Sequence, residues 1–177
     1  MEELEVHFEY YPTEEQAEDL WQAISRSTEL RSVKKLIVHM YTLPSLATFR
    51  SYLGLFQHIA HLEIRHCSMR TGDSESVRYT TETGGNHIST KQTLQSFAWT
   101  LNYDAPTHEL DPMSILAWFD VSNLTALSLE ATATNWAPLL SLCLQAKGSL
   151  RDLHIAYFDP GTGMYTCLLY TSDAADE

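Results

Sequence analysis

The chain has 177 residues, of which 44% are hydrophobic and 11% aromatic, so it is long and apolar enough to fold around one sizeable core. Its 23 acidic and 11 basic residues give a formal net charge of −12, which argues against nucleic acid or an anionic membrane as the main partner. No run of about 18 apolar residues predicts a membrane span, and the acidic start of the chain lacks the apolar stretch of a secretory signal.

Short strands and helices alternate from the start of the chain. A strand is expected at 1–6, and the segment 13–27 follows as a helix, because it opens with a capping box and continues with one apolar face. A second strand at 33–38 and a helix over 44–57 repeat this order. Pro44 suits the first turn of that helix.

The third strand, at 59–64, is followed by a different kind of segment. Residues 68–92 are polar, contain the pair Gly84-Gly85 and show no helical period. A loop of this length inside a compact domain is either functional or mobile. We interpret it as an insertion that replaces one helix. It is either a lid over a binding face or a mobile insertion, and we favour the second.

Three more strands complete the pattern, at 94–99, 124–129 and 150–155. Helices are expected between them over 111–119 and 135–148. Each unit therefore reads strand, turn, helix and return. This order predicts a parallel sheet with helices packed against it.

All six strands share one template, apolar-x-x-apolar-x-apolar, as in "IAHLEI". The copies begin at residues 1, 33, 59, 94, 124 and 150. With Cys67 and Asn102 at the ninth position of two copies, the pattern resembles the leucine-rich-repeat signature L-x-x-L-x-L-x-x-N/C-x-L over nearly all of 1–166. The resemblance implies an α/β solenoid with a parallel β-sheet on the concave face and helices on the convex face. Uneven spacing and other residues at the ninth position of the remaining copies make the array irregular.

The last eleven residues, "CLLYTSDAADE" at 167–177, resemble the one-frame translation of a transposase adapter used to make sequencing libraries. The alternative is a natural C-terminus with an amphipathic start and an acidic end. We favour the adapter, so the segment is set aside when the fold is considered. The repeat domain is therefore expected over 1–166, as a fragment with the natural chain continuing differently after Thr166.

The concave face is the expected binding surface. Side chains alternate along a strand, so the residues between the template positions point to that face. Charged and histidine side chains concentrate in its first three strands, while the fourth and fifth strands present smaller ones. The candidates for binding a protein partner are Glu3, Glu5, His7, Lys35, His39, His61, Glu63, Arg65, Glu130, Asp152 and His154.

The histidines raise the question of a metal site. His7 and His39 should lie in neighbouring strands, about 5 Å apart. Zinc needs three or four converging ligands, and no spacing here matches a known zinc pattern, so we expect no metal and no other cofactor. Cys67 is interpreted as the buried repeat residue and Cys143 as a small core residue. Three cysteines without close pairing indicate a reducing compartment, cytoplasmic or nuclear.

Enzyme signatures are missing from the chain. It has no G-x-S-x-G, Walker loop, H-E-x-x-H or G-x-G-x-x-G motif. The glycine-rich "DPGTG" at 159–163 lacks the lysine and helix of a phosphate loop. We therefore expect no catalytic residues and no enzyme activity.

The irregular strand–helix units, the aromatic-rich core and the cysteine copy are similar to the repeat regions of fungal and other eukaryotic F-box proteins. This resemblance implies a protein–protein interaction module that recognises the substrate protein of a cullin-type ubiquitin ligase, with an upstream F-box that binds the adaptor. A repeat scaffold or immune-type receptor fragment unrelated to ubiquitination is the alternative, and an enzyme with an unrecognised site is the rival class. We expect neither nucleic acid nor membrane as a partner.

Overall fold

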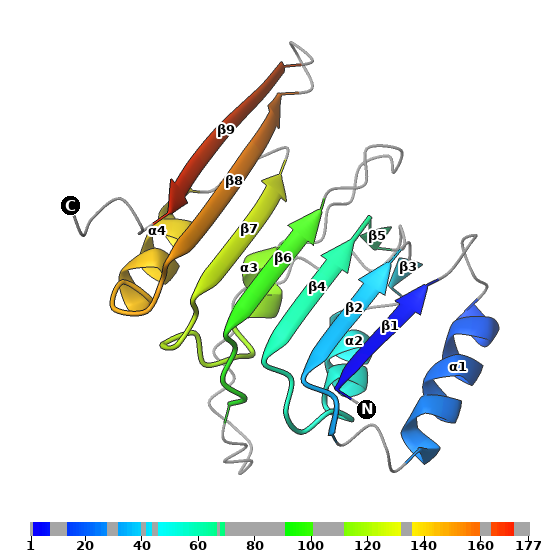
Figure 1. Ribbon diagram of the computed structural model, residues 1–177. Coiled ribbons are helices and arrows are strands. Elements are labelled where there is room, and N and C mark those ends of the chain that lie inside the picture. The colour runs from blue at the N-terminus through cyan, green and yellow to red at the C-terminus, as the bar shows by residue number, and fades with distance from the viewer. Residues whose placement is uncertain are drawn as a thin grey trace.

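The structure is a computed structural model that describes residues 2–7, 14–27, 32–39, 42–43, 46–66, 68–69, 91–100, 112–131, 136–159 and 164–171. The chain forms an α/β fold in which helices pack against a seven-stranded, mostly parallel sheet (Figure 1). The sheet consists of β1 (Glu3–His7), β2 (Lys35–His39), β4 (His61–Arg65), β6 (Ser96–Thr100), β7 (Ala126–Ala131), β8 (Asp152–Asp159) and β9 (Met164–Thr171). The helices are α1 (Glu14–Arg26), α2 (Leu46–Leu53), α3 (Pro112–Leu116) and α4 (Trp136–Gln145).

The strands of this sheet lie side by side in the order of the sequence. From β1 to β8 every neighbouring pair is parallel, and β9 adds to the edge as an antiparallel partner of β8. The six predicted template segments coincide with the six parallel strands. The α/β class with a parallel sheet is therefore confirmed.

The last strand includes part of the tail that was set aside. In β9, Cys167 lies opposite Ala156 and Thr171 opposite Asp152. Residues 172–177 lie outside the described part of the chain. The adapter origin of the tail stays a prediction.

Template side chains form the core between the sheet and the helices. In the three central repeats the core residues are at most 2% exposed: Val33, Leu36, Val38, Ile59, Leu62, Ile64, Leu94, Phe97 and Trp99. Burying one such aliphatic side chain contributes about 1.5–3 kcal/mol. The template thus explains both why these segments are strands and which face of each strand the helices cover.

The helices pack beside one another through aromatic side chains. Figure 1 shows α2, α3 and α4 behind the sheet and α1 at its β1 edge. Trp21 of α1 stacks on Tyr52 of α2 with ring centroids 4.8 Å apart, and it meets Phe56 edge-on at 6.5 Å. Phe49 and Trp118 continue the series at 6.4 Å. None of the helices in the described part of the chain is long and apolar enough to span a membrane.

The same hydrogen-bond pattern recurs wherever one strand leads to the next. The carbonyl oxygen at the second template position accepts the backbone N–H groups of the second and third positions of the following copy. It occurs at five successive steps, at the carbonyls of Glu2, Lys34, Ala60, Gln95 and Thr125, with donor–acceptor distances of 2.7–3.2 Å. A carbonyl oxygen has two lone pairs, so each one satisfies both donors. The units therefore repeat in backbone structure as well as in sequence.

The insertion at 68–92 is described only at its two ends. Ser68–Met69 form a short strand, β5, which pairs in parallel with β3 (Thr42–Leu43). At the other end, Gln92 donates from Nε2 to the carbonyl of Phe56, and its Oε1 accepts from the backbone N–H of Ile59 at 3.3 Å. The two ends are therefore joined to the fold, and the interpretation of 68–92 as an insertion that replaces one helix stays a prediction. Residues 70–90 lie outside the described part of the chain, as do the ninth-position residues Cys67 and Asn102.

Candidate functional site

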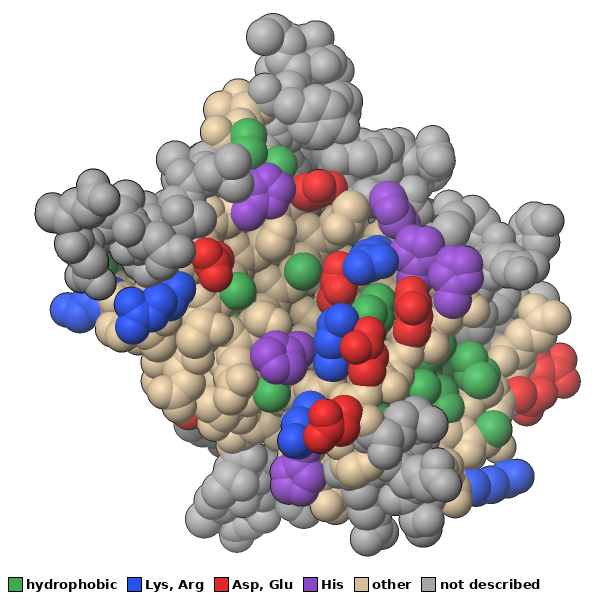
Figure 2. Space-filling model, in the orientation of Figure 1, with side chains coloured by type: hydrophobic (Ala, Val, Ile, Leu, Met, Phe, Trp, Pro, Cys, Tyr) green, Lys and Arg blue, Asp and Glu red, His purple; other side chains and the backbone are tan. Residues whose placement is uncertain are grey.

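We call the sheet surface opposite the helices the open face. The strand register aligns its side chains in the columns expected from the sequence. The first column is Glu3, Lys35, His61, Ser96, Ala126 and Asp152; the second is Glu5, Ile37, Glu63, Ala98, Ser128 and His154. The third comprises His7, His39, Arg65 and Thr100, and continues with the pair Glu130 and Ala156. Figure 2 shows charged and histidine side chains gathered over β1, β2 and β4.

The cations of the open face are paired with carboxylates beside them. Lys35 Nζ lies 2.9 Å from Glu3 Oε1 on the neighbouring strand. The guanidinium of Arg65 lies 2.6 Å from Glu63 Oε1, two residues away on the same strand. This hydrogen-bonded contact raises the pKa of Arg65 above its ordinary value. Both pairs are partly exposed, and each therefore adds little stability.

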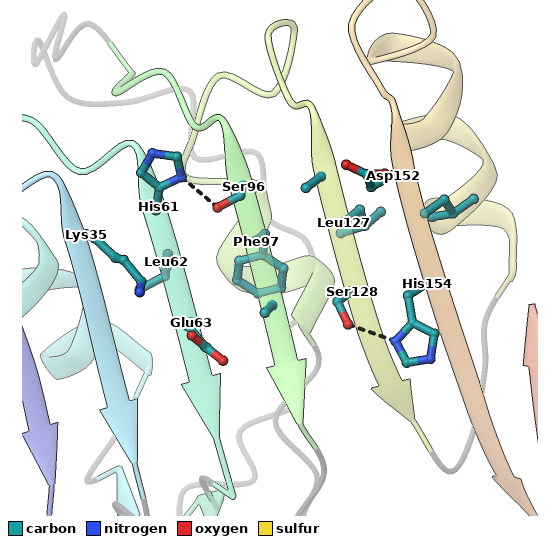
Figure 3. A pocket seen from close by; sticks show the side chains of 13 residues that line it. Lys35, His61, Leu62, Glu63, Ser96, Phe97, Leu127, Ser128, Asp152 and His154 are labelled. Carbon is teal, nitrogen blue, oxygen red and sulfur yellow. Dashed lines mark hydrogen bonds between the residues drawn. The ribbon is translucent and has the colours of Figure 1, made fainter. Parts of the chain in front are cut away.

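A hollow of about 300 Å³ lies in the middle of the open face (Figure 3). Its floor carries four small side chains from β6 and β7: Ser96, Ala98, Ala126 and Ser128. Its walls carry longer side chains, namely Lys35, His61 and Glu63 on one side and Asp152 and His154 on the other. From β4 to β8 the sheet advances three strand spacings, or about 14 Å. The hollow therefore exists because small residues in two central strands stand between large residues in their neighbours.

A serine hydroxyl contacts each wall histidine across a strand boundary. His61 Nδ1 and Ser96 Oγ are 2.8 Å apart, and Ser128 Oγ and His154 Nδ1 are 3.0 Å apart. Figure 3 shows the two pairs at opposite walls of the hollow. Which atom donates depends on the tautomer of each imidazole. These contacts fix the orientation of both rings.

No protein-family model, curated protein or solved structure matches the chain. The function must therefore be inferred from the open face itself. Its chemical features are the hollow, the paired and unpaired charges around it, and the histidines at its walls and at the strand ends.

Three histidines meet at the C-terminal ends of β1, β2 and β4. The rings of His7 and His39 stack with centroids 4.5 Å apart, close to the spacing expected, and His66 meets His39 edge-on at 5.3 Å. His66 has a φ of 54°, a left-handed conformation that turns the chain out of the strand. Stacked rings do not converge on one point. Among the described residues, no three His, Cys, Asp or Glu side chains form a group that could hold a metal ion.

The pKa of His39 is lowered by its place in this stack. Burial disfavours the charged imidazole and is the largest cause. Positive charge on His7, His66 or Arg65 acts in the same direction, whereas Glu5 opposes it. Its Nδ1 is buried without a hydrogen-bond partner among the described residues.

The open face separates the predicted site residues into two groups. Five of them line the hollow: Lys35, His61, Glu63, Asp152 and His154. Glu3, Glu5, His7, His39 and Arg65 lie toward β1 and the strand ends, and Glu130 lies opposite Ala156, away from the hollow. Ile37 lies between Glu5 and Glu63 in an open-face column, yet it is only 4% exposed.

The four small residues in the floor of the hollow were not among the predicted site residues. Ser96 and Ser128 contact histidines, and Ala98 and Ala126 leave the space that makes the hollow. The sequence contained a signal for them, since each serine shares a column with its histidine. Cys143, in contrast, packs partly buried against the core as expected, and burial raises the pKa of its thiol.

Proposed function

We propose that the chain is a protein-recognition module that binds its partner on the open face of the sheet. The observation that carries this proposal is the hollow, which combines a small-residue floor with charged and histidine walls and lies on a face that none of the described helices covers. Rigid strands place these side chains, so little order would be lost on binding. A partner segment could bury its side chains there without displacing any part of the core.

The architecture that we propose is a leucine-rich-repeat solenoid. Two independent regularities support it: the template shared by six strands and the backbone hydrogen bonds repeated at five successive steps. In repeat folds each unit contacts only its neighbours and the stacked units present an extended binding surface. The open face is the corresponding surface in this chain.

The ubiquitin-ligase role stays a prediction. It rests on the resemblance of the repeats to those of F-box proteins, in which this module would select the substrate and an upstream F-box would bind the adaptor. A cytoplasmic or nuclear location belongs to the same prediction. Capture of a cullin adaptor by the full-length natural protein would support this role, and partner binding without the adaptor would count against it.

The serine–histidine contacts suggest a hydrolase as the rival function. Such an enzyme needs a nucleophile, a base and hydrogen-bond donors for the negatively charged oxygen that develops during the reaction. Along the parallel ladder, the backbone N–H groups of β6 and β7 already donate to neighbouring strands. We therefore propose that Ser96 and Ser128 orient the histidines for binding.

The experiment compares the wild type with three variants in a capture assay. Ala98→Trp fills the hollow from its floor, and Ala117→Trp places the same side chain at an exposed position just after α3. Circular dichroism establishes that both variants fold. If Ala98→Trp does not fold, Ala126→Phe takes its place and blocks the hollow from the next strand. A partner identified by mass spectrometry should bind the wild type and Ala117→Trp but not the hollow variants. Equal binding to all of them would contradict the proposal.

A further inference from the structure

We infer that the hollow receives an arginine or lysine side chain from an extended segment of the partner. The inference rests on the proposed function and specifies the chemistry of the partner. It starts from the charge balance of the open face. The carboxylates there are Glu3, Glu5, Glu63, Glu130 and Asp152, and the cations are Lys35 and Arg65.

Both cations are already engaged. Lys35 is paired with Glu3 and Arg65 with Glu63, so neither is available to an acidic partner without breaking a contact. Asp152, in contrast, has no ion-pair partner among the described residues. It is exposed at the wall of the hollow formed by β8. The charge of the open face that its own cations do not balance is therefore negative, in keeping with the net charge of −12.

The shape of the hollow suits a side chain with an apolar stem and a charged tip. Ala98 and Ala126 provide an apolar floor, against which the methylene groups of arginine or lysine can pack. The tip would reach Asp152 at one wall or the free oxygen of Glu63 at the other. An acidic side chain would be repelled by both carboxylates. A purely apolar side chain would remove water from Asp152 without supplying hydrogen bonds in its place.

Orientation of the wall histidines supports the same occupant. Ser128 holds His154 and Ser96 holds His61, each through Nδ1, so that Nε2 is the nitrogen of either ring left for a ligand. In the neutral tautomer in which Nδ1–H donates to the serine oxygen, Nε2 is the acceptor. A guanidinium or ammonium group supplies several donors to such acceptors and to the carboxylates. An extended segment would present its alternate side chains to the face, so one basic residue could enter the hollow while the next lies toward Glu5.

The test measures binding of labelled extended peptides by fluorescence anisotropy. In the probe, arginine alternates with threonine; in the comparison peptides, glutamate or norleucine replaces every arginine. The arginine peptide should bind the wild type, more weakly as salt is raised, and the other two should bind at least about tenfold more weakly. Ala98→Trp or Ala126→Phe should abolish binding, whereas Ala117→Trp should not change it.

A charge-matched control separates the hollow from the overall acidity of the chain. Glu63→Gln with Asp152→Asn should weaken binding of the arginine peptide about fivefold or more, while Glu15→Gln with Asp19→Asn, on exposed α1 positions, should leave it unchanged. Equal loss in both double variants, absence of binding, or equal binding of the norleucine or glutamate peptide would overturn the inference. If the captured protein partner requires the hollow but ignores Glu63→Gln with Asp152→Asn, the inference fails and the proposed function stands. If the partner ignores Ala98→Trp and Ala126→Phe as well, the proposed function fails.

Discussion

Gln92 and Ile59 lie 33 residues apart in the sequence, yet the side-chain oxygen of Gln92 accepts the backbone N–H of Ile59 at 3.3 Å. The amide nitrogen of the same side chain donates to the carbonyl of Phe56, and its own backbone carbonyl accepts from Asp120 N–H at 2.9 Å. One residue thus joins the turn before β4 to the turn before β7. These backbone groups would otherwise be buried without partners at the entry to the central strands.

Replacing Gln92 with alanine should therefore destabilise the fold. Two backbone groups lose their partner, and leaving such groups unsatisfied costs about 1–3 kcal/mol. The control is Gln95→Ala, because Gln95 is exposed and three residues away; it should change the free energy of unfolding by less than about 0.5 kcal/mol. Urea unfolding followed by circular dichroism measures both. Equal stability of the two variants would show that Gln92 does not hold the turn.

Trp21 is expected to hold α1 against the rest of the molecule. It is 1% exposed and stacks on Tyr52, so Trp21→Ala should lower the free energy of unfolding by about 3–5 kcal/mol. The exposed Asp19 on the same helix offers a control, and Asp19→Asn should have almost no effect. The quantity to compare is the midpoint of chemical unfolding. A shift as small as that of Asp19→Asn would mean that α1 is not packed as described.

Stability should fall in mild acid because of His39. The folded state lowers the pKa of this imidazole, so the unfolded chain binds the proton more readily. The contribution of His39 is therefore fully present above the unfolded pKa of about 6.5 and is lost as pH falls through the lower folded value. His39→Phe keeps a ring in the stack and removes the titration. Between about pH 7.5 and about pH 5, this variant should lose less unfolding free energy than the wild type. Parallel pH profiles would contradict the assignment.

Leu140 and Leu144 form an apolar stripe on the outer side of α4. They are 60% and 67% exposed and one helical turn apart. The double variant Leu140→Gln with Leu144→Gln should raise the concentration at which the protein begins to aggregate, with little change in unfolding free energy. Leu142, 5% exposed on the same helix, is the contrasting position, and Leu142→Gln should destabilise the fold strongly. Light scattering against concentration provides the measurement. Unchanged aggregation in the double variant would show that the stripe is not responsible.

The columns of the open face could be predicted because two simple rules fix them. A strand alternates its side chains with a period of two, and the shared template sets the same register in each copy. These rules alone place Lys35 opposite His61, and His61 opposite Ser96, as the strand pairing has them. Burial of the template residues follows from the same rules.

Other features depend on three-dimensional packing and could not be read from the sequence. Gln92 is a polar residue at the end of a polar segment, and its partners Phe56 and Ile59 are brought to it only by the fold. Ile37 occupies an open-face position, yet it is buried, which alternation along the strand does not predict. The small residues of two adjacent strands could be predicted, but the size of the hollow above them depends on where the longer side chains beside them lie.

The most direct test of binding at the open face is site-specific crosslinking. A photo-reactive benzophenone amino acid replaces either Thr100, which lies on the open face of β6 outside the hollow and opposite Arg65, or Ala117, exposed just after α3. Each protein is irradiated with the captured partner, and the crosslinked products are identified by mass spectrometry. We predict that the partner crosslinks from position 100 and not from position 117. Crosslinking from position 117 alone, or from neither position while the complex persists, would contradict binding at the open face.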